Sequence, residues 1–135
     1  LRIHREVLAA VREAAGADFP VALRLGACDY MDGGATAEDG ARAAVLLERA
    51  GVDLLDVSGG FCGYVNPNCR EQGYFRELTE AMKREVSLPV VLTGGVVDPA
   101  AAERLLEEGA ADLIGVGRAI LKDSHWAKRA IEAQA

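Results

Sequence analysis

Four short apolar runs alternate with amphipathic helical patterns along this chain of 135 residues, and this alternation restricts its fold more than any other feature. The apolar runs cover residues 20–25, 52–58, 89–93 and 112–116. When a strand is followed by a helix and a second strand, the two strands pack in parallel with a right-handed connection. The sequence therefore predicts an α/β fold with a parallel sheet.

Helical patterns precede, separate and follow these runs. They predict helices over residues 2–15, 36–50, 74–85, 98–108, 118–121 and 126–133. Thr36 and Asp98 stand where an N-cap side chain accepts hydrogen bonds from the first free backbone amides of a helix. Asp123 or Ser124 is expected to cap the last helix in the same way.

Four strands with a leading helix make up about half of an eight-stranded (βα)8 barrel, which typically has ~250 residues. The leading helix carries an apolar face made by Ile3, Val7, Leu8 and Val11. We expect residues 1–135 to form a single partial domain, half of a TIM barrel, with no second domain in the chain. A smaller open sheet is the alternative, although the Gly-x-Gly-x-x-Gly pattern that is typical of it does not follow the first strand.

Composition narrows the classes of function. The formal net charge of −6 argues against a nucleic-acid partner, and no apolar run approaches the ~20 residues of a membrane span. Cys28, Cys62 and Cys69 are odd in number and form no Cys-x-x-Cys pair, which argues against a disulfide framework and against a metal site. We expect a cytoplasmic protein without a bound metal.

Glycines end the last two apolar runs, and they indicate a phosphate site. Gly94-Gly95 follows the third run, and Gly117-Arg118 follows the fourth. Glycine lets the backbone approach a ligand, the amides at a helix start point outward, and an arginine fork matches phosphate. In a parallel barrel, the loops after strands seven and eight form such a site together. The alternative is a tight turn at Gly94-Gly95 and an ion pair between Arg118 and a nearby acid, Asp123 or Glu108.

Arg24 and Ser58 lie at the ends of the first two runs. A charge near the end of an apolar strand needs a partner, so Arg24 either contacts a ligand or forms a salt bridge with Asp53 or Asp56. Ser58 either contacts the same ligand or caps the loop that follows it.

Four segments resemble the old yellow enzyme family of NADH:flavin oxidoreductases, in the order of strands five to eight of that barrel. They are residues 21–25 (VALRL), 51–59 (GVDLLDVSG), 89–95 (PVVLTGG) and 111–121 (ADLIGVGRAIL). As an ordered set they are specific, and the resemblance covers essentially the whole chain.

The resemblance implies the C-terminal half of an FMN-binding TIM barrel that uses NAD(P)H to reduce activated C=C bonds of a small enone or enoyl substrate. It places Arg24 at the pyrimidine edge of the flavin, and Ser58 is a further candidate contact. It also assigns the phosphate to the loops that hold Gly94, Gly95, Gly117 and Arg118. A cation beside that ring edge stabilises negative charge on reduced flavin.

The family's substrate-binding His/Asn or His/His pair lies around strand four, outside the residues matched here. His4 falls on the first predicted helix and His125 at the start of the last one, so neither corresponds to that pair. No residue is therefore assigned as catalytic, and the fragment is expected to be inactive alone.

Two other functions fit the same glycine loops. One is a different phosphate-binding barrel enzyme, such as an isomerase or aldolase, although no lysine stands at a strand end. The other is a non-catalytic half-barrel that binds phosphate and self-associates, because a half-barrel leaves strand edges and an apolar face open. The chain is accordingly expected to form a homo-oligomer.

Overall fold

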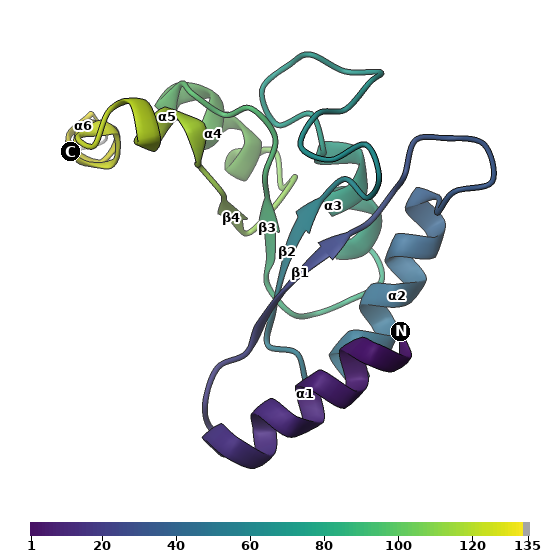
Figure 1. The fold of residues 1–135 in the computed structure, drawn as a ribbon. Helices are drawn as coiled ribbons and strands as arrows, with labels where there is room; N and C mark the ends of the chain where they lie inside the picture. Colours follow the sequence, from purple (N-terminus) through teal and green to yellow (C-terminus); the bar gives the residue numbers. More distant parts are fainter. Residues whose placement is uncertain (134–135) are drawn as a thin grey trace.

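Four parallel strands form one sheet in the computed structural model, which describes residues 1–133 (Figure 1). They are β1 (Ala22–Gly26), β2 (Leu54–Ser58), β3 (Val90–Leu92) and β4 (Leu113–Ile114), and they lie in the order β1-β2-β3-β4. A doubly wound sheet reverses its strand order at a switch point, whereas a barrel wall keeps the order of the chain. The sequential order therefore agrees with the predicted half-barrel and disfavours the open-sheet alternative.

Residues 1–133 also form six helices. They are α1 (Arg2–Ala15), α2 (Ala37–Arg49), α3 (Arg76–Lys83), α4 (Pro99–Glu107), α5 (Arg118–Lys122) and α6 (Trp126–Glu132). The predicted caps of α2 and α4 are confirmed. Thr36 and Asp39 form a reciprocal capping box, and the Asp98 carboxylate accepts from the amide of Ala100 at 3.1 Å.

Two helix starts differ from the prediction. α3 begins at Arg76 instead of Tyr74, because the Tyr74 amide donates to the Gly94 carbonyl at 3.2 Å and is held by the neighbouring loop. The N-cap of α6 is His125, not Asp123 or Ser124. The Asp123 carboxylate accepts from the His125 amide at 3.0 Å, so it closes a turn just before the helix.

One face of the sheet is covered by helices and holds the core. Side chains alternate along each strand, and Leu55, Val57, Val90 and Leu92 on this face are fully buried. They join one apolar cluster with residues of α2 and α3, including Leu47, Leu78 and Met82. This packing fixes which side chains face the other way.

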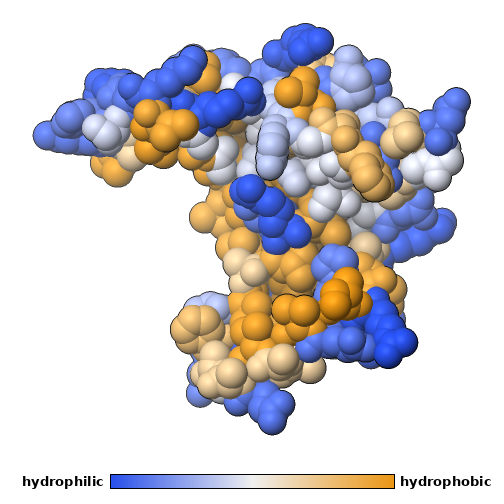
Figure 2. Space-filling view, viewed as in Figure 1, coloured by the Kyte–Doolittle hydropathy of each residue, from blue (hydrophilic) through white to orange (hydrophobic). Residues whose placement is uncertain are grey.

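The opposite face of the sheet is open. Arg24, Asp56, Val91 and Leu113 stand in register across its four strands, and Leu113 is 45% exposed. Figure 2 shows hydrophobic residues gathered on this side of the molecule. In α1, Leu8 is buried, whereas Ile3 and Val7 of the predicted apolar face are 65% and 54% exposed because no described residue covers them.

None of the helices in residues 1–133 combines the length and the apolar run that crossing a membrane requires.

Candidate functional site

The loops after β3 and β4 lie side by side at the carboxyl edge of the sheet. Leu92 and Ile114 are paired in register, and the amide of Gly115 donates to the Leu92 carbonyl at 2.8 Å. Gly94-Gly95 and Gly117-Arg118 follow directly from these two strands. The structure thus brings together the two segments from which the sequence predicted a phosphate site.

Gly94 and Gly95 adopt backbone conformations that glycine favours, with φ of +129° and +70°. A Cβ atom on Gly94 would stand 2.9 Å from Cδ2 of Tyr74, and one on Gly95 would stand 2.7 Å from Cε1. The tight turn that was the alternative interpretation is therefore present, and it admits the ring of Tyr74. That these glycines also admit a ligand stays a prediction.

Gly117 and Arg118 open the second loop. Among residues 1–133, apart from the two chain neighbours of Gly117, no heavy atom lies within 4 Å of a Cβ built on it, so the backbone there is open to approach. Arg118 is exposed, and its Nη2 donates to Oη of Tyr74 at 2.9 Å. The two acids considered as its partners are paired elsewhere, Asp123 with Arg129 and Glu108 with Arg76.

Tyr74 links the two loops, and sequence reasoning missed it. Its ring contacts the first loop, and its hydroxyl accepts from the arginine of the second. The pattern predicted a helical residue at this position. The sequence signal that could have marked it is the preceding Gly73, because glycine often stands where a helix cannot continue. In the structure Gly73 has a φ of +77°, outside the helical region.

Arg24 pairs with Asp56, one of its two predicted acidic partners. Nε and Nη2 of Arg24 both donate to Oδ2 of Asp56, at 2.8 and 2.5 Å. The other carboxylate oxygen, Oδ1, is buried and has no hydrogen-bond partner among residues 1–133. Because the Arg24 side chain remains 59% exposed on the open face, the salt bridge leaves its charge accessible to a ligand.

Ser58 ends β2 on the same face as Asp56, two residues further along the strand. Its hydroxyl donates to the carbonyl of Gly59 at 3.3 Å, which is the loop contact that the sequence offered as its alternative role. Ser58 is half-buried, and a contact with a ligand stays a prediction.

The spacing of these groups suits an elongated ligand with one anionic end. Neighbouring strands lie about 4.8 Å apart, so β1 and β4 are separated by roughly 14 Å across three spacings. Amides and a guanidinium at the β3 and β4 end suit a phosphate, and a second guanidinium on β1 suits an electron-rich ring. The residues present therefore fit a flavin mononucleotide.

Polar contacts hold the loops after β1 and β2 together. The Asp29 carboxylate accepts from the amides of Phe61 and Ala35 at 2.8 and 2.7 Å, and these two donors hold the pKa of Asp29 below its usual value. Tyr30 donates to Glu77 at 2.6 Å, and burial together with this carboxylate raises the pKa of the phenol. These contacts stabilise the rim of the site.

No group of three potential metal ligands exists within residues 1–133, and the three cysteines are free thiols. Burial raises the pKa of Cys62, which disfavours the reactive thiolate. His4 lies on α1 and His125 caps α6, so neither joins the loops after β3 and β4.

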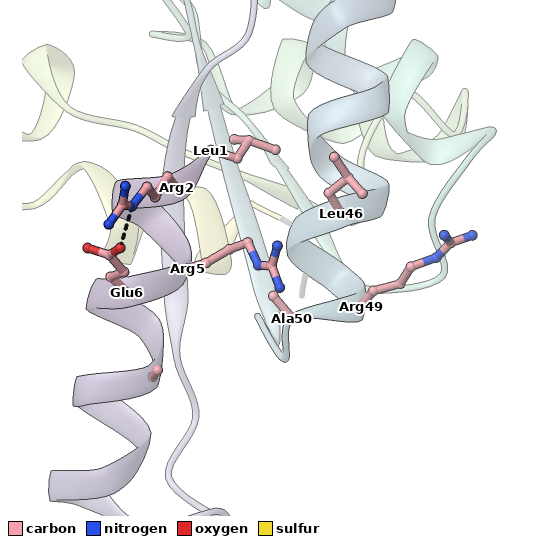
Figure 3. A pocket seen from close by; sticks show the side chains of 8 residues that line it. Leu1, Arg2, Arg5, Glu6, Leu46, Arg49 and Ala50 are labelled. Atoms are coloured by element: carbon pink, nitrogen blue, oxygen red, sulfur yellow. Dashed lines mark hydrogen bonds and ion pairs between the residues drawn. The ribbon is translucent and has the colours of Figure 1, made fainter.

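A separate hollow of about 870 Å³ lies between the start of α1 and the end of α2 (Figure 3). Arg2, Arg5 and Arg49 line it together with Glu6, which pairs with Arg2 at 2.7 Å. None of the predicted site residues contributes to it.

The chain is similar to proteins of one enzyme family. The NADH:flavin oxidoreductase / NADH oxidase family matches residues 1–135. The chain is 36% identical to an NADH oxidase of Thermoanaerobacter brockii over 99% of its length and 21% of the relative's. It is 32% identical to an NADPH dehydrogenase of Bacillus subtilis, covering 96% of this chain and 37% of that protein. The chain therefore spans between a fifth and two fifths of these relatives.

Solved structures show the same fold. An amine oxidase for 6-hydroxypseudooxynicotine from Pseudomonas geniculata superimposes with a TM-score of 0.83 and 27% identity, over 98% of this chain and 20% of that one. A histamine dehydrogenase from Rhizobium gives a TM-score of 0.82 at 23% identity, over 98% of this chain and 19% of that one. Together with the sequential parallel sheet, these likenesses confirm the predicted half-barrel. The ordered motifs, the matched family and the relatives agree, and the chain belongs to the NADH:flavin oxidoreductase / NADH oxidase family, whose members use FMN with NAD(P)H as reductant.

Proposed function

We propose that this chain forms the flavin-binding half of a barrel enzyme that uses FMN and NAD(P)H to reduce activated C=C bonds of a small enone or enoyl substrate. The observation that carries the proposal is that Gly94-Gly95 and Arg118 meet around Tyr74 at the carboxyl edge of the sheet. Arg24 stands exposed on the open face of the same sheet. Relatives named NADH oxidase and NADPH dehydrogenase support a nicotinamide as the reductant.

FMN, when bound, supplies hydride acceptance from the nicotinamide and hydride donation to the substrate. The residues of this chain bind and orient it. Arg118 and the amides around Gly117 would hold the phosphate. Arg24, oriented by Asp56, would stand beside the pyrimidine edge and stabilise negative charge there, and Ser58 would contact the ring from β2.

The substrate would enter through the mouth formed by the loop at residues 59–73. Phe61 and Tyr64 of this loop are 89% and 78% exposed, and we assign them to the rim. None of the described residues matches the family's His/Asn or His/His pair, so residues 1–135 alone would bind flavin without turnover. Three free thiols favour a reducing compartment such as the cytoplasm.

Self-association is the second function that a specific observation favours. Leu113 on the open face and Ile3 and Val7 on α1 are apolar and exposed. A second copy of the chain would cover them, and two half-barrels could close one barrel. Sedimentation at micromolar concentration is expected to show a dimer, and a monomer would contradict this proposal.

Titration of the purified chain with FMN, followed by flavin fluorescence, tests the proposed function. We expect saturable binding that Arg118→Ala weakens roughly ten- to a hundredfold, since charged hydrogen bonds contribute about 1.5–3 kcal/mol. Arg42→Ala is the matched control, because Arg42 is an exposed arginine on α2 whose ion pair is with Asp39. A folded chain that does not bind FMN would contradict the proposal, and competition by a sugar phosphate would favour another class of barrel enzyme.

A further inference from the structure

We propose that Tyr74 is a positioning residue that holds Arg118 ready for the phosphate of FMN. The inference rests on the proposed function and extends it to a residue that belongs to neither glycine loop. Three contacts carry it: the ring against Gly94 and Gly95, the hydroxyl against Arg118, and the same hydroxyl against the loop at residues 59–73.

The ring of Tyr74 is fixed in place. It is half-buried, and its carbon atoms occupy the space that a side chain on Gly94 or Gly95 would need. Phe75 packs against it edge to face, with ring centroids 4.8 Å apart and planes at 81°. The backbone is held too, because the Tyr74 amide donates to the Gly94 carbonyl at 3.2 Å. The hydroxyl is therefore presented at a defined point beside the first loop.

The hydroxyl also donates and accepts its hydrogen bonds in defined directions. A phenol has one proton to donate, and here that proton goes to the backbone carbonyl of Tyr64. The hydroxyl therefore turns a lone pair toward Arg118, whose Nη2 donates to it at 2.9 Å. An arginine has five N–H donors in a rigid fork, so one bond to Tyr74 orients the guanidinium and leaves other donors for a phosphate.

Orientation matters because Arg118 is exposed. A free arginine side chain loses rotamer freedom when it closes on a ligand, and a side chain that is already held in place loses less. Tyr74 thus improves binding of the phosphate without contacting it. Because its proton goes to Tyr64, it also connects the phosphate site with the loop at the rim.

FMN and riboflavin together test this role, because riboflavin has the same ring and ribityl chain but no phosphate. Tyr74→Phe keeps the ring and removes the hydroxyl. We expect it to weaken FMN binding about three- to tenfold, the range for ordering one flexible side chain on binding, and to leave riboflavin binding unchanged. Arg42→Ala is again the control, because Arg42 is an exposed arginine on α2 whose ion pair is with Asp39.

A double-mutant cycle separates positioning from direct contact. If Tyr74 acts through Arg118, Tyr74→Phe will change FMN affinity little in an Arg118→Ala background. Equal losses for FMN and riboflavin, or full additivity with Arg118→Ala, would overturn the inference while leaving the proposed function intact. A wild-type chain that binds no FMN would instead overturn the proposed function, and the inference with it.

Discussion

Two arginine–aspartate ion pairs lie near the start and the middle of β2, and the two arginines differ in how many of their hydrogen-bond donors are used. Arg12, in the last turn of α1, pairs with Asp53 just before β2. Arg24 in β1 pairs with Asp56 in β2, and Asp56 lies three residues after Asp53. The Arg12 side chain is 21% exposed, whereas that of Arg24 is 59% exposed.

Arg12 uses most of its donors within the fold. Besides Asp53, it donates to the backbone carbonyls of Ala17, Phe19 and Gly51. It thereby joins the end of α1 and the turn after it to the segment that enters β2. This guanidinium has an evident structural role, because its partners are carbonyls that the loops leave unpaired.

Arg24 bonds to a single oxygen of Asp56 and points its remaining donors over the open face. Similar ion pairs can therefore serve different purposes. Arg12, whose donors bind within the fold, stabilises the structure, whereas Arg24 is exposed and keeps donors available to a ligand.

The largest expected effect is on stability, at Arg12. Arg12→Met keeps an apolar stem, leaves three carbonyls without their donor and leaves Asp53 with only the amide of Val21. We therefore expect a loss of about 1.5–3 kcal/mol in the free energy of unfolding. Arg24→Met should lose less, because it removes one ion pair whose guanidinium is largely in solvent and leaves no backbone carbonyl without its donor. Urea denaturation measures the free energy of unfolding of both variants. Equal losses would contradict the different roles of Arg12 and Arg24.

Ligand binding should reverse this order. We expect Arg24→Met to weaken FMN binding about tenfold, since one charged contact beside the ring is lost. Arg12→Met, measured where it is fully folded, should bind FMN within about twofold of the wild type. Flavin fluorescence titration measures both, and a larger loss with Arg12→Met would place the flavin elsewhere.

A smaller effect is expected at Asp56. Asp56→Asn keeps the shape of the side chain and removes the negative charge beside Arg24, so the cation should stabilise reduced flavin more strongly. We expect the midpoint potential of bound FMN to rise by up to about 20 mV, because about 30 mV corresponds to about 1.4 kcal/mol for two electrons. Spectroelectrochemistry measures the shift, with Asp53→Asn as the control, and a lower potential would contradict the assigned role.

The smallest effect concerns acid stability. The amide of Val21 and the guanidinium of Arg12 hold the pKa of Asp53 below its usual value. The stabilisation is therefore fully present above about pH 4, the unfolded pKa, and is lost as the pH falls through the lower folded value. The difference in melting temperature between wild type and Asp53→Asn should shrink on acidification, and a difference that grows toward low pH would contradict it.

Hydrophobic periodicity in the sequence was sufficient to predict the order and the type of the secondary-structure elements. Alternating apolar runs and helical patterns predicted all four strands and all six helices of residues 1–133, because a strand and a helix expose their side chains with different periods. The strands are shorter than the runs, and β4 reduces to Leu113–Ile114. Strand length depends on pairing with a neighbour, and a single run contains no information about its neighbour.

The candidate site was predictable only in part. Gly94, Gly95, Gly117 and Arg118 stood out because glycines end two adjacent strands. Tyr74 did not, because its role depends on contacts with residues twenty and forty-four positions away. The partner of Arg24 was narrowed to two acids, and only the parallel register of β1 and β2 selected Asp56.

The sequence alone determined the α/β class, the caps of α2 and α4 and the two glycine loops, since each of these depends on residues that are near neighbours in the chain. The tertiary structure decided which arginine is saturated and which stays exposed. It also decided that Tyr74 bridges the two loops. Both outcomes depend on distances between segments that the folded sheet brings together, and local propensity carries no information about such distances.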